Sequence, residues 1–99
     1  MTIQKRAEGT ELTIAVDGRI DTTTAPELEA EIAASIGEIT KLSFDFAGLE
    51  YISSAGLRVL LAAQKKMKDM SRVVILNANE GVKEIFEVTG FVDILDIQS

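Results

Sequence analysis

The stretch Tyr51-Ile52-Ser53-Ser54-Ala55-Gly56-Leu57 decides the fold, because it joins an apolar strand to a long amphipathic helix through four small residues. The first backbone N–H groups of a helix have no partners within the helix and carry the positive end of its dipole. An anion at this turn is therefore stabilised. We call residues 51–57 the elbow, and we predict that Ser54 is a phosphoacceptor.

The small residues of the elbow also have a purely structural interpretation. A serine just before a helix commonly caps it, and its side-chain oxygen then contributes about 1 kcal/mol to stability. We expect Ser53 in that role. Gly56 falls in the first helical turn, where a missing side chain allows either close packing or access for a partner.

Length and composition limit the chemistry that the chain can perform. Ninety-nine residues with 46% hydrophobic content form one domain, residues 1–99, around one core. The sequence has no cysteine and no histidine, which excludes disulfides, a Ser-His-Asp hydrolase and a histidine-ligated zinc site. The spacing of Asp17, Asp21 and Asp45 matches no metal-binding loop. We therefore predict no enzyme activity, no metal and no cofactor.

The charge of the chain argues against nucleic acid as a partner. The formal net charge is −6, and no basic stripe is visible along the sequence. The acidity lies in residues 1–50, which suits either a basic protein partner or solubility. No signal peptide and no membrane-spanning run is present, so we expect a cytoplasmic protein without direct membrane insertion.

The first half of the chain predicts a hairpin, a helix and a strand. Alternating apolar residues from Ile3 to Val16 indicate two strands that meet at Glu8-Gly9. Thr24-Ala25-Pro26-Glu27 has the form of a capping box, which predicts the start of a helix. We expect Gly37 to end this helix. Its apolar stripe is Leu28, Ile32, Ser35 and Ile36. Leu42, Phe44 and Phe46 alternate with polar residues in a strand over 41–46, which residues 47–50 link to the elbow.

The second half predicts two further helices and two further strands. The first is a helix from Ser54 to about Met70, with Lys65, Lys66 and Lys68 near its end. A buried strand follows over residues 72–76. Asn77-Ala78-Asn79 then caps a helix over 80–89, and an edge strand follows within 91–97. Strands joined through helices imply parallel pairing with right-handed crossovers. The fold class is therefore α/β, a mixed and mostly parallel sheet of four to five strands packed against three or more helices.

The elbow, the strand before it and the segment Gly18-Arg19-Ile20-Asp21 together resemble the STAS family, the sulphate transporter and anti-sigma factor antagonist domains. The resemblance to the stand-alone antagonists covers nearly the whole chain. The usual family pattern at the elbow is Asp-Ser-Ser-Gly or Asp-Ser-Ala-Gly, and its first serine, which a partner kinase phosphorylates, falls on Ser54. This chain departs from the pattern in having Ser53 where many members have aspartate, so Ser53 is the second candidate for the phosphosite.

The resemblance implies an anti-sigma factor antagonist that acts as an interaction switch. Such a protein binds an anti-sigma factor serine kinase when unphosphorylated, is released when Ser54 is phosphorylated, and is restored by a serine phosphatase. We expect the partner-binding residues to be Asp21, Thr22, Thr23, Ser53, Ser54 and Arg58. Arg58 would contact the partner or pair with the phosphate, and an ordinary solvated helix residue is the alternative.

Two other functions are compatible with the sequence. The chain could be a constant STAS subunit of a larger complex, such as a lipid-transporting ABC complex or a stress-sensing assembly, with no phosphorylation. It could also bind a nucleotide at the elbow, although the elbow lacks the lysine and the second glycine of a Walker-type loop.

Overall fold

The computed structural model describes residues 1–35, 37, 39–67 and 72–98. Within them it contains six strands, three α-helices and one short 3₁₀ helix. The elements in chain order are β1 (Thr2–Glu8), β2 (Glu11–Ile20), α1 (Ala25–Ser35), β3 (Lys41–Asp45), β4 (Leu49–Ile52), α2 (Ser54–Met67), β5 (Val74–Leu76), α3 (Glu80–Val88), η1 (Phe91–Asp93) and β6 (Asp96–Gln98).

Strand β2 organises the sheet, because it pairs with three other strands. It is antiparallel to β1 across a tight turn that contains Gly9 at a φ of 61°. Its first half pairs in parallel with β3, and its last residues pair in parallel with β4 beyond a bulge at Gly18 and Arg19. Strands β5 and β6 continue the sheet in parallel beyond β3. The mixed, mostly parallel α/β sheet predicted from the sequence is confirmed.

Two strand predictions need correction. Residues 47–50 were expected to link β3 to the elbow, but Leu49 begins β4, so the sheet has one strand more than the four to five predicted. In the edge strand expected within 91–97, Phe91–Asp93 instead forms a 3₁₀ turn, and only Asp96–Gln98 pairs with β5. The turn follows Gly90, whose φ of 79° redirects the chain, and is held by a 2.8 Å bond from Leu95 N to Phe91 O.

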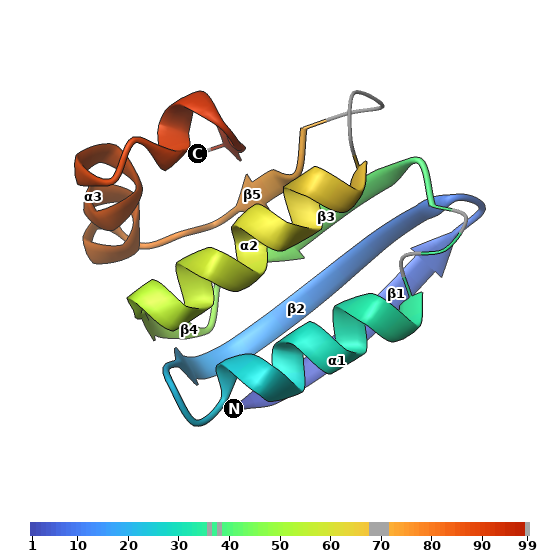
Figure 1. Ribbon diagram of the computed structural model, residues 1–99, viewed down its shortest axis with the longest axis horizontal. Coiled ribbons are helices and arrows are strands. Elements are labelled where there is room, and N and C mark those ends of the chain that lie inside the picture. The colour runs from blue at the N-terminus through green and yellow to red at the C-terminus, as the bar shows by residue number, and fades with distance from the viewer. Residues whose placement is uncertain (36, 38, 68–71, 99) are drawn as a thin grey trace.

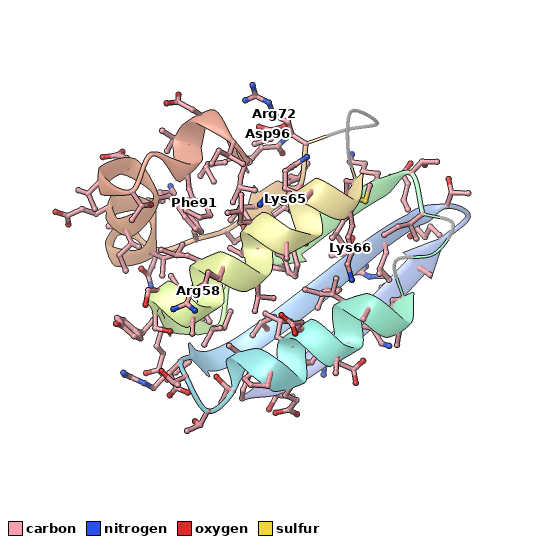
Figure 2. The ribbon with its side chains drawn as sticks, in the orientation of Figure 1. Arg58, Lys65, Lys66, Arg72, Phe91 and Asp96 are labelled. Atoms are coloured by element: carbon pink, nitrogen blue, oxygen red, sulfur yellow. The ribbon has the colours of Figure 1, made fainter. Side chains whose placement is uncertain are left out.

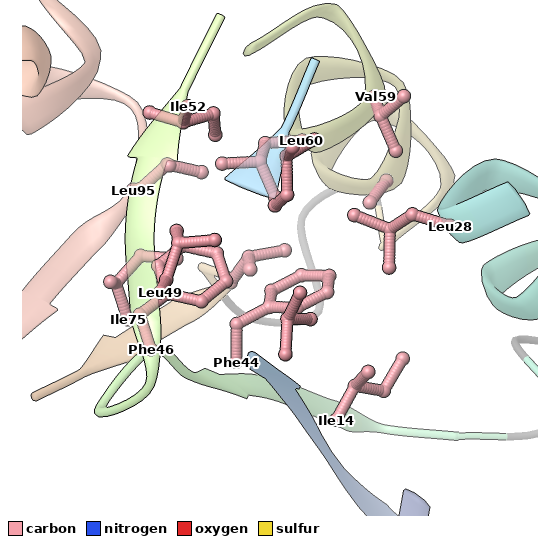
Figure 3. Close-up of a cluster of buried hydrophobic side chains, with 14 of the residues drawn as sticks. Ile14, Leu28, Phe44, Phe46, Leu49, Ile52, Val59, Leu60, Ile75 and Leu95 are labelled. Carbon is pink, nitrogen blue, oxygen red and sulfur yellow. The ribbon is translucent and has the colours of Figure 1, made fainter. Parts of the chain in front are cut away.

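Helices α1 and α2 lie side by side over one face of the sheet, and α3 lies against β4, beyond the amino-terminal end of α2 (Figure 1). The helices and the sheet enclose one apolar core (Figure 3). Its largest fully buried side chains include Phe44, Phe46, Leu28, Leu60 and Ile75. Each such side chain contributes about 1.5 to 3 kcal/mol when it leaves water, so burial of this core stabilises the packing of the helices on the sheet.

The helix boundaries follow the sequence signals in part. Asn79 caps α3 as predicted, since its Oδ1 accepts a 2.8 Å hydrogen bond from Val82 N. The described part of α2 ends at Met67, and the predicted continuation through Lys68 to Met70 lies outside the described residues. Ile36, predicted in the stripe of α1, also lies outside them.

The start of α1 is built differently from the predicted capping box. The hydroxyl of Thr24 accepts a hydrogen bond from Asp21 N at 2.8 Å and lies 2.9 Å from the Arg19 carbonyl oxygen, to which it donates. The carboxylate of Asp21 instead accepts from Thr23 N at 3.0 Å and from Thr24 N at 3.1 Å. The Asp21 carboxylate, and not the Thr24 hydroxyl, therefore accepts the hydrogen bonds of the backbone N–H groups before the helix. The Thr24 side chain is bound instead to the end of β2.

These hydrogen bonds favour the charged form of Asp21. The hydroxyl of Thr23, which donates to Oδ1 at 2.7 Å, and then the backbone N–H of Thr24 hold the pKa of this carboxyl below its ordinary value of 3.8. The turn from Asp21 to Thr24 is thus ordered by one carboxylate.

The first turn of α2 lies in direct contact with the ends of β2 and β4. A Cβ placed on Gly56 would lie 2.6 Å from both Ile20 Cγ2 and Ile52 Cγ1, which no real Cβ tolerates. Of the two roles considered for this glycine, the structure shows the close-packing one. Gly56 therefore sets how near the elbow lies to the sheet.

The first prediction concerns this contact. Gly56→Ala is expected to lower the free energy of unfolding by up to about 2 kcal/mol, since overpacking costs about 1 to 3 kcal/mol and the better helix propensity of alanine returns about 1. Urea unfolding of both proteins measures the difference. Gly81→Ala in α3 is the matched control, because a Cβ there meets only Asn79 Oδ1 at 3.4 Å. Equal effects of the two substitutions would contradict the close-packing role.

The second prediction concerns the pH dependence of stability. A carboxyl whose pKa is lowered by folding stabilises the protein above its unfolded pKa, and this contribution is lost as the pH falls through its folded pKa. The melting temperature of Asp21→Asn should therefore lie below that of the wild type near pH 7, and the gap should close as the pH falls below 3.8.

Asp93→Asn is the control, because Asp93 is exposed and its carboxylate has no partner among the described residues. A constant gap between Asp21→Asn and the wild type over this pH range would show that the hydrogen bonds of the Asp21 carboxylate do not stabilise the fold.

Candidate functional site

The elbow brings two separate segments of the chain to one end of the sheet. Strands β2 and β4 run in parallel, so their carboxyl ends meet at the same edge. Ser53 N donates a 2.8 Å hydrogen bond to Ile20 O, which joins the residue before α2 to the last residue of β2. The turn that carries Asp21 therefore begins directly beside the start of α2, at the same end of the molecule in Figure 1.

The two serines of the elbow have different environments. Ser53 is half-buried, and its Oγ accepts a long hydrogen bond of 3.4 Å from Gly56 N, in the geometry of the expected helix cap. Ser54 is the first residue of α2 and is exposed. Its hydroxyl has no hydrogen-bond partner among the described residues. A group that must reach a serine hydroxyl from solvent thus meets Ser54 unobstructed, while Ser53 is engaged with the helix.

The other predicted site residues surround Ser54 on two sides. Thr22 and Thr23 are exposed on the turn after β2, and Asp21 is half-buried at its start, where its carboxylate accepts a hydrogen bond from Thr23 N. Arg58 is exposed one turn further along α2, and four residues is the spacing at which helical side chains become neighbours. The structure brings all six predicted residues to one region of the surface.

One pair of residues beside this region was missed in the sequence. The guanidinium carbon of Arg19 lies 4.8 Å from the centre of the Tyr51 ring, in a cation–π contact. Tyr51 keeps 39% of its surface exposed. Both residues alternate with the buried Ile20 and Ile52, so they point to the face of the sheet opposite α2. The alternation of exposed and buried residues could have indicated this pair in the sequence. It can be recognised only when residues 49–52 are known to form strand β4.

The described residues offer no metal site, and a cavity that they form lies away from the elbow. No group of three or more carboxylates among them is arranged to hold a metal ion. A cavity of about 380 Å³ lies between α3, η1 and β6, is lined by residues of both charges such as Arg72, Lys83 and Asp96, and contains none of the predicted site residues. Nor does any helix in the described ranges have the length and apolar character needed to cross a membrane.

Two curated proteins resemble the chain over most of its length. BtrV of Bordetella bronchiseptica is 36% identical over 85 residues, which cover 83% of this chain and 72% of BtrV. The anti-sigma-B factor antagonist of Listeria monocytogenes is 31% identical over 97 residues, which cover 96% of this chain and 85% of the relative. Both relatives are thus matched over most of the chain.

A solved structure shows the same fold at lower identity. The structure of SpoIIAA, an anti-sigma factor antagonist of Bacillus, is known in two forms. The unphosphorylated form aligns with this chain at a TM-score of 0.78 and 18% identity, and the phosphorylated form at a TM-score of 0.76 and 19% identity. The alignments cover 99% of this chain in both cases, and 88% and 92% of the two SpoIIAA chains.

The family model of the STAS domain matches residues 2–99. This match includes every strand and helix of the structure, together with the elbow and the turn after β2. It confirms the resemblance noted in the sequence. The chain belongs to the STAS domain family.

Proposed function

We propose that this chain is an anti-sigma factor antagonist that works as a phosphorylation-controlled interaction switch. In the unphosphorylated state it binds an anti-sigma factor serine kinase through the elbow and the turn at Asp21, and phosphorylation of Ser54 releases it. A serine phosphatase restores binding. The Listeria relative, named as an anti-sigma-B factor antagonist, and the existence of SpoIIAA in both phosphorylation states support this proposal.

One observation carries the proposal. The hydroxyl of Ser54 is exposed and has no partner among the residues that the structure describes, and Ser54 is the first residue of α2, near the exposed Thr22 and Thr23. A kinase that holds this surface as its docking site has the acceptor hydroxyl within the contact area. Binding and phosphorylation therefore involve the same few residues.

The physical effect of the phosphate follows from this placement. A phosphoserine adds about −1.5 to −2 charges at pH 7. At the start of α2 the unpaired N–H groups and the helix dipole stabilise that charge in the unbound protein. In the complex the same charge must leave water and enter a contact surface, which costs free energy unless the partner offers a cation. Phosphorylation thus weakens binding without any change in the fold.

The third prediction tests the switch by binding. Calorimetry with the purified anti-sigma factor kinases of the same organism should find one that binds the wild type and Ser54→Ala, and that binds Ser54→Asp at least about tenfold more weakly. The reason is the charge placed in the contact surface. Equal affinity for Ser54→Ala and Ser54→Asp would contradict the switch and would instead favour a constant subunit of a larger complex.

The fourth prediction distinguishes the two serines. Incubated with that kinase and ATP, the wild type and Ser53→Ala should each gain one phosphate by intact mass, and Ser54→Ala should gain none. Ser53→Ala should also lose about 0.5 to 1 kcal/mol of stability, since its role is that of a helix cap. A phosphate on Ser53 in the Ser54→Ala protein would move the acceptor one residue upstream.

A further inference from the structure

Helix α2 carries a charge opposite in sign to that of the rest of the chain. It contains Arg58, Lys65 and Lys66 and no acidic residue, in a chain of net charge −6. By contrast, α1 contains three glutamates and no base, and α3 contains three glutamates against one lysine. In Figure 1, α1 runs alongside α2, whereas α3 lies beyond the amino-terminal end of α2. The surface over α1 and α2 is therefore a basic band along α2 with an acidic border along α1.

The cations of this band are available to a partner. Arg58, Lys65 and Lys66 are exposed, and none of them forms an ion pair among the described residues, whose ion pairs use Lys5, Lys41 and Lys83. In Figure 2, Arg58 lies on the side of α2 away from the sheet, and Lys65 and Lys66 project from opposite edges of the helix. Their charges are not neutralised within the part of the fold that the structure describes.

The helix dipole explains only some of this charge. Cations near the carboxyl end of a helix are stabilised by the dipole, which accounts for Lys65 and Lys66 in the last turn of α2. Arg58 lies in the second turn, close to the positive end, where the dipole disfavours a cation. Arg58 has no stabilising partner among the described residues, so neither the helix dipole nor an ion pair within them explains its position.

Four residues line up on the outward side of the helix with the phosphoacceptor at one end. At about 100° per residue, Ser54, Arg58, Leu61 and Lys65 fall within an arc of roughly 60°, and the stripe is about 16 Å long. We call these four residues the α2 stripe. A partner surface of standard size covers about 800 Å², or roughly 30 Å across, so a partner centred on Ser54 reaches Lys65.

We propose that the α2 stripe continues the partner-binding surface beyond the elbow and receives an acidic surface of the partner protein. This inference rests on the proposed function, because it places the same partner that contacts Ser54. Charge complementarity selects that partner surface: Arg58 and Lys65 attract carboxylates, while the glutamates of the neighbouring α1 repel them. The half-buried Leu61 between the two cations supplies an apolar contact.

The stripe also explains why a phosphate on Ser54 would be effective. The phosphate adds about two negative charges to the end of a surface whose two cations carry two positive charges. Phosphorylation thus cancels the attraction for an acidic partner and adds repulsion next to Arg58. The same carboxylates that bind the unmodified stripe oppose the modified one.

The fifth prediction tests the stripe by charge reversal. The anti-sigma factor kinase that binds the unmodified chain serves as the probe. At low salt, Arg58→Glu and Lys65→Glu should each weaken binding roughly tenfold, and the loss should shrink as salt screens the charges. Arg6→Glu in β1 is the matched control, because it makes the same charge change at an exposed position away from α2. Losses no larger than that of Arg6→Glu would overturn the proposal.

A cross-linking experiment identifies the chemistry of the partner surface. A zero-length carbodiimide joins amines only to carboxylates in contact, so it should link Lys65 to an Asp or Glu of the kinase. Lys65→Arg keeps the charge and should retain affinity but lose this cross-link. A complex without any cross-link from Lys65 would show that no acidic surface covers the stripe.

The outcomes separate this inference from the proposed function. If no kinase binds, or if Ser54→Ala and Ser54→Asp bind equally, the switch itself fails. If the switch works and the charge reversals act like Arg6→Glu, only the stripe fails. A dimer seen by light scattering that Lys65→Glu dissociates would assign the stripe to a second copy of the chain and would also overturn the proposal.

Discussion

The close approach of the first turn of α2 to the ends of β2 and β4 is the constraint on which the functional surface depends. Only a residue without a side chain fits between α2 and the two isoleucines that end these strands, and that residue is Gly56. The hydrogen bond from Ser53 N to Ile20 O joins the same two strand ends through the backbone. As a result, Ser54 stands beside the turn that follows β2, although more than thirty residues separate them in sequence.

This arrangement divides the elbow and the residues around it into a structural part and a part that the proposed function uses for recognition. Ser53, Gly56 and the carboxylate of Asp21 are used for hydrogen bonds and packing. By contrast, Ser54, Thr22 and Arg58 are exposed. Their side chains form no hydrogen bond or ion pair among the described residues. A covalent change at Ser54 can therefore alter what the surface binds while the core stays intact. Such a switch needs no second conformation, only a change in the charge that the surface presents.

Much of the fold could be predicted from the sequence, because most elements carry a clear local pattern of small, alternating or capping residues. The small residues of the elbow, the alternation in β3 and the cap at Asn79 each indicated the observed element. Strand β4 was missed because its four residues are too few to show a period, and it pairs with the part of β2 beyond the bulge at Gly18. That pairing depends on tertiary structure, and so does the exposed pair of Arg19 and Tyr51 that it creates.

The site showed the same division between local and tertiary information. The serines could be placed at the start of a helix from the residue pattern alone, and the resemblance to the STAS family selected Ser54 between them. The hydrogen bonds of Thr24 could not be predicted, since they depend on where the end of β2 lies. In the sequence, the lysines of α2 were interpreted only as helix-end charges. Their alignment with Arg58 and Ser54 on the outward side of the helix supports the proposed role in partner binding.

The central claim, that phosphorylation of Ser54 changes the surface and leaves the fold alone, is most directly tested by comparing backbone NMR spectra of the unmodified and the Ser54-phosphorylated chain. The account predicts chemical-shift changes confined to the elbow, the turn at residues 21–24 and the first two turns of α2. Shift changes that extend through the core to α3 and β6 would contradict it, because they would show that the phosphate acts by rearranging the fold.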